Sequence, residues 1–391
     1  MLSEKKIETK KRISPYIFLF LLYIPLIFMG YGSDNDTYSV LETWKKFLAT
    51  QDYVPSRLPG YVIHEFGTYV LSRIGGSVLS NLVTLLFAVI TCLVFIKILR
   101  MFSLPDITVL LLILNPVYIV NSTSTIDYIW ALCFFVLGIY LLLQKKIVFA
   151  NVSLALAAAI RLSYGILVFG VFIYFFCLYF KEDRKIIKPF LFGVLIILAI
   201  NFAAYYLPID FTEWRMSLYL HASVGDASLW SPLMRIGRWG YKNLLFWGIP
   251  TALLVFCLFA LKIKNLKPAH EPDKKIIVGV SLIILVLVEV IFLFYPIEIE
   301  YLLPVLPFAA LLLAVMFKEK KGMLLLLSIL IFLNGFYSIN LAKPNIPNQA
   351  SSAKVQISLS QGYLVNNAEE RVSLIQCDTL ACYDSVKSSQ K

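Results

Sequence analysis

The chain has 391 residues, of which 59% are apolar and only 15% are charged, and its formal net charge is +11. A soluble chain of average composition carries nearer to a quarter charged residues, so this one has too little polar side chain to cover a water-soluble globule. The composition therefore excludes a soluble globular protein. It predicts an all-α membrane protein that crosses the bilayer many times.

Apolar stretches that match or approach the length of a transmembrane helix recur along the whole chain. No small-residue cleavage site follows the first stretch, so we expect an uncleaved first span rather than a signal peptide. The eleven predicted spans are 14–31, 78–99, 107–121, 127–143, 147–160, 163–180, 189–207, 244–261, 276–294, 301–317 and 322–338.

The distribution of charge predicts the orientation of these spans. With the N-terminus in the cytoplasm, the N-terminal stretch and the short inner loops together hold most of the 35 Lys and Arg residues, as the positive-inside rule requires. The net positive charge then faces the cytoplasm, which explains it without a nucleic acid partner. An odd number of spans places the C-terminus outside, and we expect the inner or plasma membrane of a bacterium.

The polar segments predict where function lies. Residues 1–338 are expected to form a transmembrane catalytic domain with two long outer loops, about 32–77 and 208–243, and residues 339–391 an outer tail or small cap. Cys377 and Cys382 lie in this tail. An oxidising compartment predicts a disulfide between them; two free thiols are the alternative if the tail is cytoplasmic.

The first outer loop begins with Asp34 and Asp36, directly after the first span. Apolar residues at helical spacing follow, and they predict an amphipathic helix lying in the outer membrane interface. A second interfacial helix is expected over about 61–74. A carboxylate in this position can act as a general base, whereas the alternative is that Asp36 only caps the first interfacial helix.

Four short motifs follow one another along the chain. They are Asp34-Asn35-Asp36-Thr37-Tyr38, Pro55-Ser56-Arg57-Leu58-Pro59-Gly60-Tyr61, the Asn115-Pro116 turn with Asp127, and Glu300-Tyr301-Leu302-Leu303-Pro304-Val305-Leu306-Pro307. Their order resembles the GT-C superfamily of membrane glycosyltransferases, which is related to the protein O-mannosyltransferases and the lipid A aminoarabinose transferases. The chain departs from the family pattern at Asn35, which separates the two acids, at Val62 and at Glu300.

The resemblance implies an enzyme that moves a sugar, of hexosyl or pentosyl type, from a polyprenyl-phosphate carrier at the outer membrane face. The acceptor is a lipid, a glycan or a protein of the cell envelope. Either Asp34 or Asp36 is the expected base, or the two share a divalent cation, Mg²⁺ or Mn²⁺, because hard cations select carboxylate oxygens. No other cofactor is implied.

Arginine is the expected ligand of the carrier phosphate, because its guanidinium presents a rigid fork of donors. Arg57 is the first candidate, although it can instead extend to lipid headgroups. Arg161, Arg235 and Arg238 are further candidates. Residues expected to border the same cavity are Tyr61, His64, Glu65, Asp127, His221, Glu289 and Tyr301.

Three of these residues have structural alternatives. His64 and Glu65 fit the face of an interfacial helix. Glu289 lies within a span, where a carboxylate is costly and is a functional candidate, but a buried hydrogen bond to a neighbouring span also explains it.

Two other functions remain open. The loop at 208–243 is rich in Arg and contains His221, as expected of a polysaccharide polymerase or ligase that uses lipid-linked glycans. A transporter or flippase ranks third, because transport is expected to need ionisable groups at mid-membrane in several spans, and Glu289 is the one found there.

Overall fold

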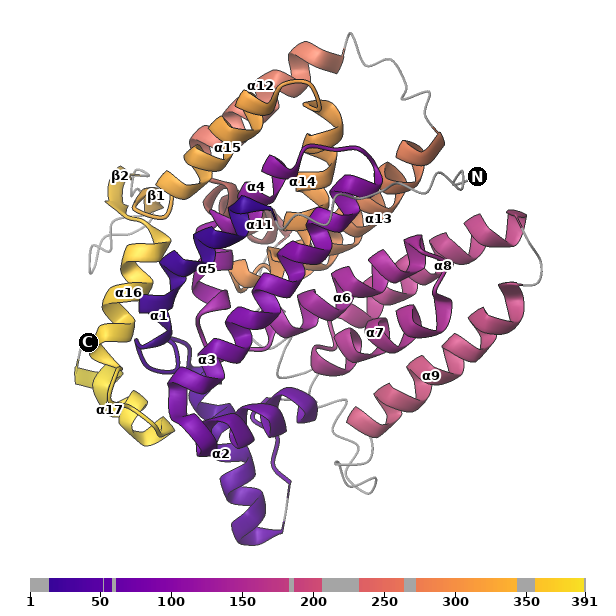
Figure 1. Cartoon of the computed structure of the whole chain (residues 1–391). Helices are drawn as coiled ribbons and strands as arrows, with labels where there is room; N and C mark the ends of the chain where they lie inside the picture. Colours follow the sequence, from indigo (N-terminus) through magenta and orange to yellow (C-terminus); the bar gives the residue numbers. More distant parts are fainter. Residues whose placement is uncertain are drawn as a thin grey trace.

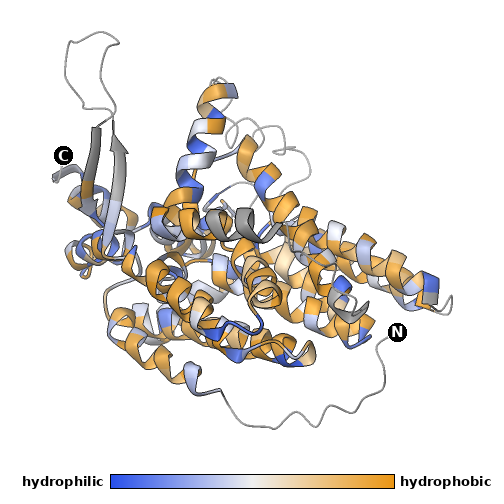
Figure 2. Cartoon of the chain, turned by 90° about the horizontal axis from the view of Figure 1, so that it is seen from above, coloured by the Kyte–Doolittle hydropathy of each residue, from blue (hydrophilic) through white to orange (hydrophobic). Residues whose placement is uncertain are grey.

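The computed structural model describes residues 14–51, 53–57, 61–182, 186–205, 232–263, 272–342 and 356–389. His221 and the centre of the second predicted outer loop lie outside these residues. The described chain is nearly all helical, and its apolar helices pack side by side around one extended hydrophobic core (Figure 1). Apolar residues dominate most of the helices (Figure 2).

The elements follow one another with few long connections among the described residues. In chain order they are η1 (Pro15–Tyr23), α1 (Ile24–Ile27), α2 (Asn35–Thr50), α3 (Val62–Met101), η2 (Asp106–Val109), α4 (Leu110–Ile113), α5 (Pro116–Ser122), α6 (Tyr128–Leu143), α7 (Ile147–Ile160), α8 (Tyr164–Glu182), α9 (Ile187–Tyr205), α11 (Pro232–Trp247), α12 (Ile249–Ile263), α13 (Pro272–Phe294), η4 (Ile299–Leu302), α14 (Val305–Met316), α15 (Lys321–Leu333), β1 (Tyr337–Ala342), β2 (Gln356–Gln361), α16 (Tyr363–Ser373) and α17 (Leu380–Ser389).

Four helices of the described chain are long and apolar enough to cross a membrane. They lie in α3, α8, α9 and α13, and shorter apolar helices accompany them. The chain is therefore a multi-pass integral membrane protein, although fewer helices reach spanning length than the eleven that the sequence predicts.

One predicted span is divided because its sequence contains a capping residue. Within 107–121 the helix stops at Leu114, and the side chain of Asn115 accepts hydrogen bonds from the backbone N–H groups of Val117 and Tyr118, at 3.0 and 3.1 Å. This caps α5, whose first residue is Pro116. An Asn cap followed by Pro is a strong helix start, so the apolar run forms two short helices.

A second difference lies near the C-terminus. The span predicted over 322–338 ends at Leu333, and Tyr337–Ala342 pairs with Gln356–Gln361 as an antiparallel hairpin. The fold is therefore not strictly all-α. The Asn334-Gly335 pair explains the stop, because Asn and Gly favour the end of a helix.

The second interfacial helix and the following span form one kinked helix, α3. The kink lies at Gly75 and Gly76, and Gly76 has a φ of +62°. Glycine adopts this conformation at little cost, so the pair lets the chain change direction without ending the helix.

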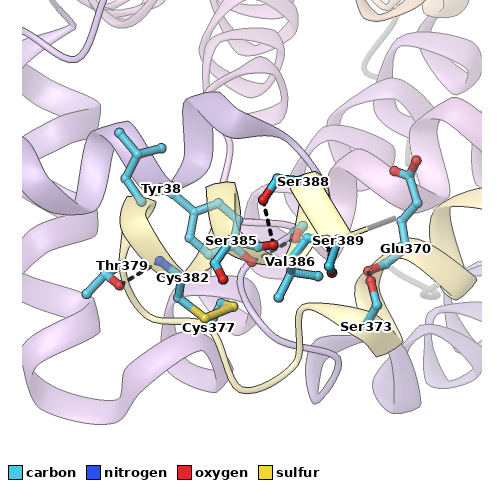
Figure 3. The surroundings of a disulfide bond; sticks show 12 residues. Tyr38, Glu370, Ser373, Cys377, Thr379, Cys382, Ser385, Val386, Ser388 and Ser389 are labelled. Atoms are coloured by element: carbon cyan, nitrogen blue, oxygen red, sulfur yellow. Dashed lines mark hydrogen bonds between the residues drawn. A yellow bond between two sulfur atoms is a disulfide. The ribbon is translucent and has the colours of Figure 1, made fainter. Parts of the chain in front are cut away.

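The C-terminal residues fold back onto the bundle (Figure 1). Helix α16 packs against α5, and α17 packs against α2. A disulfide joins Cys377, between the two helices, to Cys382 in the first turn of α17, beside the ring of Tyr38 on α2 (Figure 3). The predicted pairing is present in the structure, and residues 363–389 of the tail form a folded lobe.

Candidate active site

The two acidic residues after the first apolar helices have different local roles. The side chain of Asp34 caps α2, because its Oδ1 accepts a hydrogen bond from the backbone N–H of Asp36 at 3.0 Å. The capping role considered for Asp36 therefore belongs to Asp34. Asp36 lies in the first turn of the helix, and its side chain turns toward Arg57.

Arg57 joins the first loop to a buried carboxylate. Its guanidinium donates to Oδ2 of Asp36 at 2.5 Å and to Oδ2 of Asp127 at 3.1 Å. Oδ1 of Asp127 accepts from Arg161 at 2.6 Å. Asp127 has no exposed surface. Two acids and two arginines thus alternate in one network, and a buried charge is tolerated when it is paired in this way.

Glu65 holds the segment that carries Arg57. This buried carboxylate accepts hydrogen bonds from the N–H and the hydroxyl of Ser56, at 3.0 and 2.5 Å, and a further one from the hydroxyl of Tyr53. The guanidinium carbon of Arg57, Cζ, also lies 4.7 Å from the ring centre of Tyr61. Glu65 is therefore placed to orient Arg57 rather than to meet a substrate.

Arg161 follows the last residue of α7 and lies among aromatic rings. Its Cζ is 3.5 Å from the ring centre of Tyr128 and 5.2 Å from that of Tyr301. The hydroxyl of Tyr128 donates to Glu298. The ring faces stabilise a desolvated guanidinium, so Arg161 remains charged although it is 4% exposed.

Asp34 lies in an acidic environment. Burial, together with the negative charges of Asp36, Glu298 and Glu300, raises the pKa of Asp34 to about 7, while the N–H of Asp36 opposes them. Burial also raises the pKa of Glu300, which the hydroxyl of Tyr363 partly offsets by donating to it. Asp34 therefore exchanges its proton near neutral pH.

The basic side chains of the site remain cationic. Burial lowers the pKa of Arg57, but the Asp127 and Asp36 carboxylates outweigh this effect and raise it overall. Burial lowers the pKa of Lys242 on α11, and Glu300 opposes that change. Lys242 therefore lies near the acidic side of the site, where the charges of Glu300 and Glu298 act on it.

The carboxylates do not fit a shared divalent cation. One oxygen of Asp34 binds the backbone of α2 and Asp36 pairs with Arg57. Among the described residues, no three His, Cys, Asp or Glu side chains are grouped to hold a metal ion. Because both carboxylates are already engaged in this way, we derive no catalytic step through Mg²⁺ or Mn²⁺.

Glu289 lies apart from this network, whereas the charges of Asp127, Arg57 and Arg161 act on His64. The carboxylate of Glu289 accepts hydrogen bonds from Trp239 Nε1 at 2.7 Å and Asn243 Nδ2 at 3.0 Å, which ties α13 to α11. His64 is buried against the ring of Trp130.

Arg235 and Arg238 lie on α11, and Arg238 opposes protonation of Lys242.

The sequence motifs did not single out Glu298, Lys242 or Tyr363. Glu298 and Glu300 stand two residues apart before an apolar helix, and this spacing is a signal that could have indicated a second acidic pair. Tyr363 lies in the polar tail, and its sequence gives no comparable signal.

Comparison with known proteins identifies one family. The model of the EpsG family matches residues 11–351, which is nearly the whole chain and includes the residues of this network. No curated protein and no solved structure matches the chain.

Proposed function

The chain belongs to the EpsG family, and on this premise we propose that it is a membrane glycan polymerase that joins saccharide units carried on a polyprenyl phosphate. Family membership supports a polymerase or ligase-like role more directly than the transfer of a single sugar to a lipid or protein. We place the reaction at the outer membrane face, where the positive-inside rule puts Asp34 and Asp36.

The proposed reaction is a displacement at the anomeric carbon of the donor saccharide. A hydroxyl of the acceptor saccharide forms a bond to this carbon, and its proton passes to a carboxylate. The bond from the anomeric carbon to the carrier phosphate oxygen breaks, and the phosphate leaves with the electron pair. Bringing two bound substrates together supplies much of the rate enhancement.

We assign the general base to Asp34. A base works best when its pKa lies near the working pH, and the pKa of Asp34 is about 7. Asp36 is less suited to this role because Arg57 already neutralises it at 2.5 Å. This assignment makes Asp36 a group that orients Arg57.

Arg57 and Arg161 are the proposed ligands of the leaving phosphate. Asp127 holds both guanidinium groups through hydrogen bonds of 3.1 and 2.6 Å. The Nε–H of Arg57 is buried, and no group among the described residues accepts a hydrogen bond from it. An unused buried donor is costly, and a phosphate oxygen is an acceptor of the right charge.

One observation carries the proposal. Asp36 from the first loop is joined through Arg57 to Asp127 and Arg161, although three separate parts of the chain supply these residues, and Asp34 lies beside Asp36 at the start of the same helix. A proton acceptor and phosphate ligands are thus brought together beside an apolar helix bundle. This is the arrangement that a lipid-linked saccharide needs.

The test is a deletion of the gene in its host, followed by complementation with variants. The deletion strain is expected to lose a polysaccharide of high mass and to accumulate its lipid-linked repeat. The double variant Asp34→Asn/Asp36→Asn is expected to behave like the deletion, while Glu319→Gln, at an exposed acidic residue, restores the polymer. Normal polymer from the double variant, at equal protein level, would contradict the proposal.

A further inference from the structure

The residues beyond the region that the family model matches make direct contact with the candidate active site. We call residues 363–389 the C-terminal lobe; they comprise α16, α17 and the disulfide-bonded turn between them. The matched region ends at residue 351. The C-terminal lobe contributes Arg371, which is 1% exposed although it belongs to a helix of mostly polar residues.

Arg371 is bound by carbonyl groups and not by an acid. Its guanidinium donates to the carbonyls of Leu26 at 2.7 Å, Met29 at 3.2 Å and Thr123 at 2.8 Å, and to the hydroxyl of Thr123 at 3.0 Å. These carbonyls lie at the C-terminal ends of α1 and α5. Such ends carry partial negative charge and unpaired acceptors, so a buried cation there is satisfied without a carboxylate.

The contacts of Arg371 fix the segment that leads to Asp34. Met29 is followed by Gly30, whose φ is +68° and at which a Cβ atom would approach the Cα of Ile375 in the C-terminal lobe to 3.2 Å. The close approach of two backbones shows that the lobe is fitted to this turn. The next residues of the same segment are the acidic motif.

Other residues of the C-terminal lobe hold the start of α2. Asn367 donates to the hydroxyl of Ser33 at 2.6 Å, and the ring of Tyr383 lies 4.9 Å from that of Tyr38 (centre to centre). The backbone N–H of Leu380 donates to Glu42 at 3.1 Å. Figure 3 shows Tyr38 packed beside the disulfide. The lobe therefore contacts the acidic motif both before and after Asp34.

We propose that the C-terminal lobe is a clamp on the candidate active site, in which Arg371 is a positioning residue that fixes the segment carrying Asp34. The proposal rests on the proposed function in one respect, namely that Asp34 is the general base that takes the proton from the acceptor hydroxyl. Arg371 acts through the backbone of residues 26–33, and it is not a catalytic residue.

The clamp also accounts for the environment of Asp34. The titratable groups that act on its charge are Asp36 on α2, Glu298 and Glu300 at η4, Tyr363 on α16 and Tyr383 on α17. Burial is the largest cause of its raised pKa, and the lobe supplies part of that cover. Loosening the lobe is therefore expected to admit water and to lower the pKa of Asp34 toward its ordinary value.

The first measurement is hydrogen–deuterium exchange of the purified full-length chain in detergent. Arg371→Met removes the donors while keeping a long apolar side chain. It is expected to speed exchange at least tenfold in peptides covering residues 28–40, with α9 unchanged. Arg371→Lys, which keeps the charge, is expected to restore part of the protection. Arg100→Met is the matched control, because Arg100 pairs with Asp106 at the C-terminal end of α3.

The second measurement is carbodiimide labelling of Asp34 as a function of pH. Its midpoint is expected to fall by one pH unit or more in Arg371→Met and to stay unchanged in Arg100→Met. If Arg371→Met does not fold, the double variant Asn367→Ala/Tyr383→Leu removes two other contacts of the C-terminal lobe with this segment and leaves the buried Arg371 in place. Unchanged exchange in residues 28–40 and an unchanged midpoint, in either folded variant, would overturn the clamp.

Polymer production separates this inference from the proposed function. Arg371→Met is expected to lower polymer yield at least tenfold at equal protein level, with partial rescue by Arg371→Lys. If the wild-type gene made no polymer, the proposed function would fail, whereas the exchange and labelling results would still decide whether the C-terminal lobe clamps the acidic motif.

Discussion

The guanidinium carbon of Arg161 lies 3.5 Å from the centre of the Tyr128 ring. Tyr128 directly follows Asp127, which binds the same guanidinium at 2.6 Å. Two neighbouring residues thus hold Arg161 by an ion pair and by a ring face. Because Tyr128 also donates to Glu298, this pair connects the basic side of the candidate site to its acidic side.

The first prediction concerns Asp127→Asn. This change leaves the buried Arg161 and the partly buried Arg57 without their common carboxylate, and breaking a buried ion pair by removing one partner costs about 3–5 kcal/mol. We expect a lower thermal unfolding midpoint for the detergent-purified variant and loss of polymer. The double variant Asp127→Asn/Arg161→Met removes a charge of each sign, and it is expected to be more stable than Asp127→Asn alone. Equal melting of wild type and Asp127→Asn would contradict the buried network.

The second prediction concerns pH. Asp34 must lose its proton to act as a base, so polymer synthesis by membrane vesicles is expected to rise with pH and to reach half of its maximum near pH 7, where the pKa of Asp34 lies. A rate that is flat between pH 5.5 and 8.5 would argue against Asp34 as the base.

The raised pKa of Asp34 makes activity rise with pH, but it makes the folded state less stable as pH rises. The folded-state pKa of Asp34 lies above its value in an unfolded chain, so the unfolded state releases this proton first as pH rises. The contribution of Asp34 to folding therefore becomes unfavourable above pH 4 and remains so above pH 7. Asp34→Asn keeps a capping side chain, and we expect it to raise the unfolding temperature at pH 8 while abolishing activity. A lower unfolding temperature in this variant would contradict the assignment.

Local sequence predicted much of the helical structure. The bounds of α6, α7 and α8 agree closely with the apolar runs, because each run is closed by turn residues or charges. The span predicted over 107–121 is divided at Asn115, because hydropathy alone does not indicate where a side chain caps a helix. The hairpin after Leu333 was missed because a short strand in a polar tail has little periodicity to detect.

The site was predictable only in part. Asp34, Asp36 and Arg57 could be singled out because they lie together in one loop. Asp127 was expected to border the same cavity, but it is 70 residues from Arg57, so its pairing with Arg57 depends on packing. The partners of Arg371 are backbone carbonyls, which every residue possesses, so no sequence pattern indicates that this arginine is buried.

The third prediction concerns Glu65→Gln. The amide keeps the shape of the side chain but replaces an acceptor by a donor, so it cannot receive the hydrogen bonds of both Tyr53 and Ser56. We expect a loss of about 1–3 kcal/mol in unfolding free energy, faster hydrogen exchange in residues 53–57 and reduced polymer yield. Glu369→Gln, at a hydrogen bond between exposed groups, is the control and should change none of these. Normal exchange in Glu65→Gln would refute its role in orienting Arg57.

The fourth prediction separates a structural carboxylate from a catalytic one. Glu289 accepts hydrogen bonds from Trp239 and Asn243, and the amide oxygen of glutamine can accept both. Glu289→Gln is therefore expected to keep polymer yield within about twofold of wild type, because a neutral acceptor costs less to bury than a charged one. Glu289→Leu leaves both donors unpaired and should lower the unfolding temperature. A tenfold loss of polymer in a stable Glu289→Gln variant would return Glu289 to the list of candidates for catalysis.

The fifth prediction concerns the side of the membrane on which the network lies. Lys46 at the exposed end of α2 is expected outside, whereas Lys146 and Lys320 lie in short basic connections and are expected in the cytoplasm. In intact cells, a membrane-impermeant maleimide should therefore label Lys46→Cys, and it should label Lys146→Cys and Lys320→Cys only after permeabilisation. The paired Cys377 and Cys382 do not react, and the chain without added cysteine gives the background. Labelling of Lys146→Cys in intact cells would place Asp34 in the cytoplasm, where an outward-facing polymerase cannot use it.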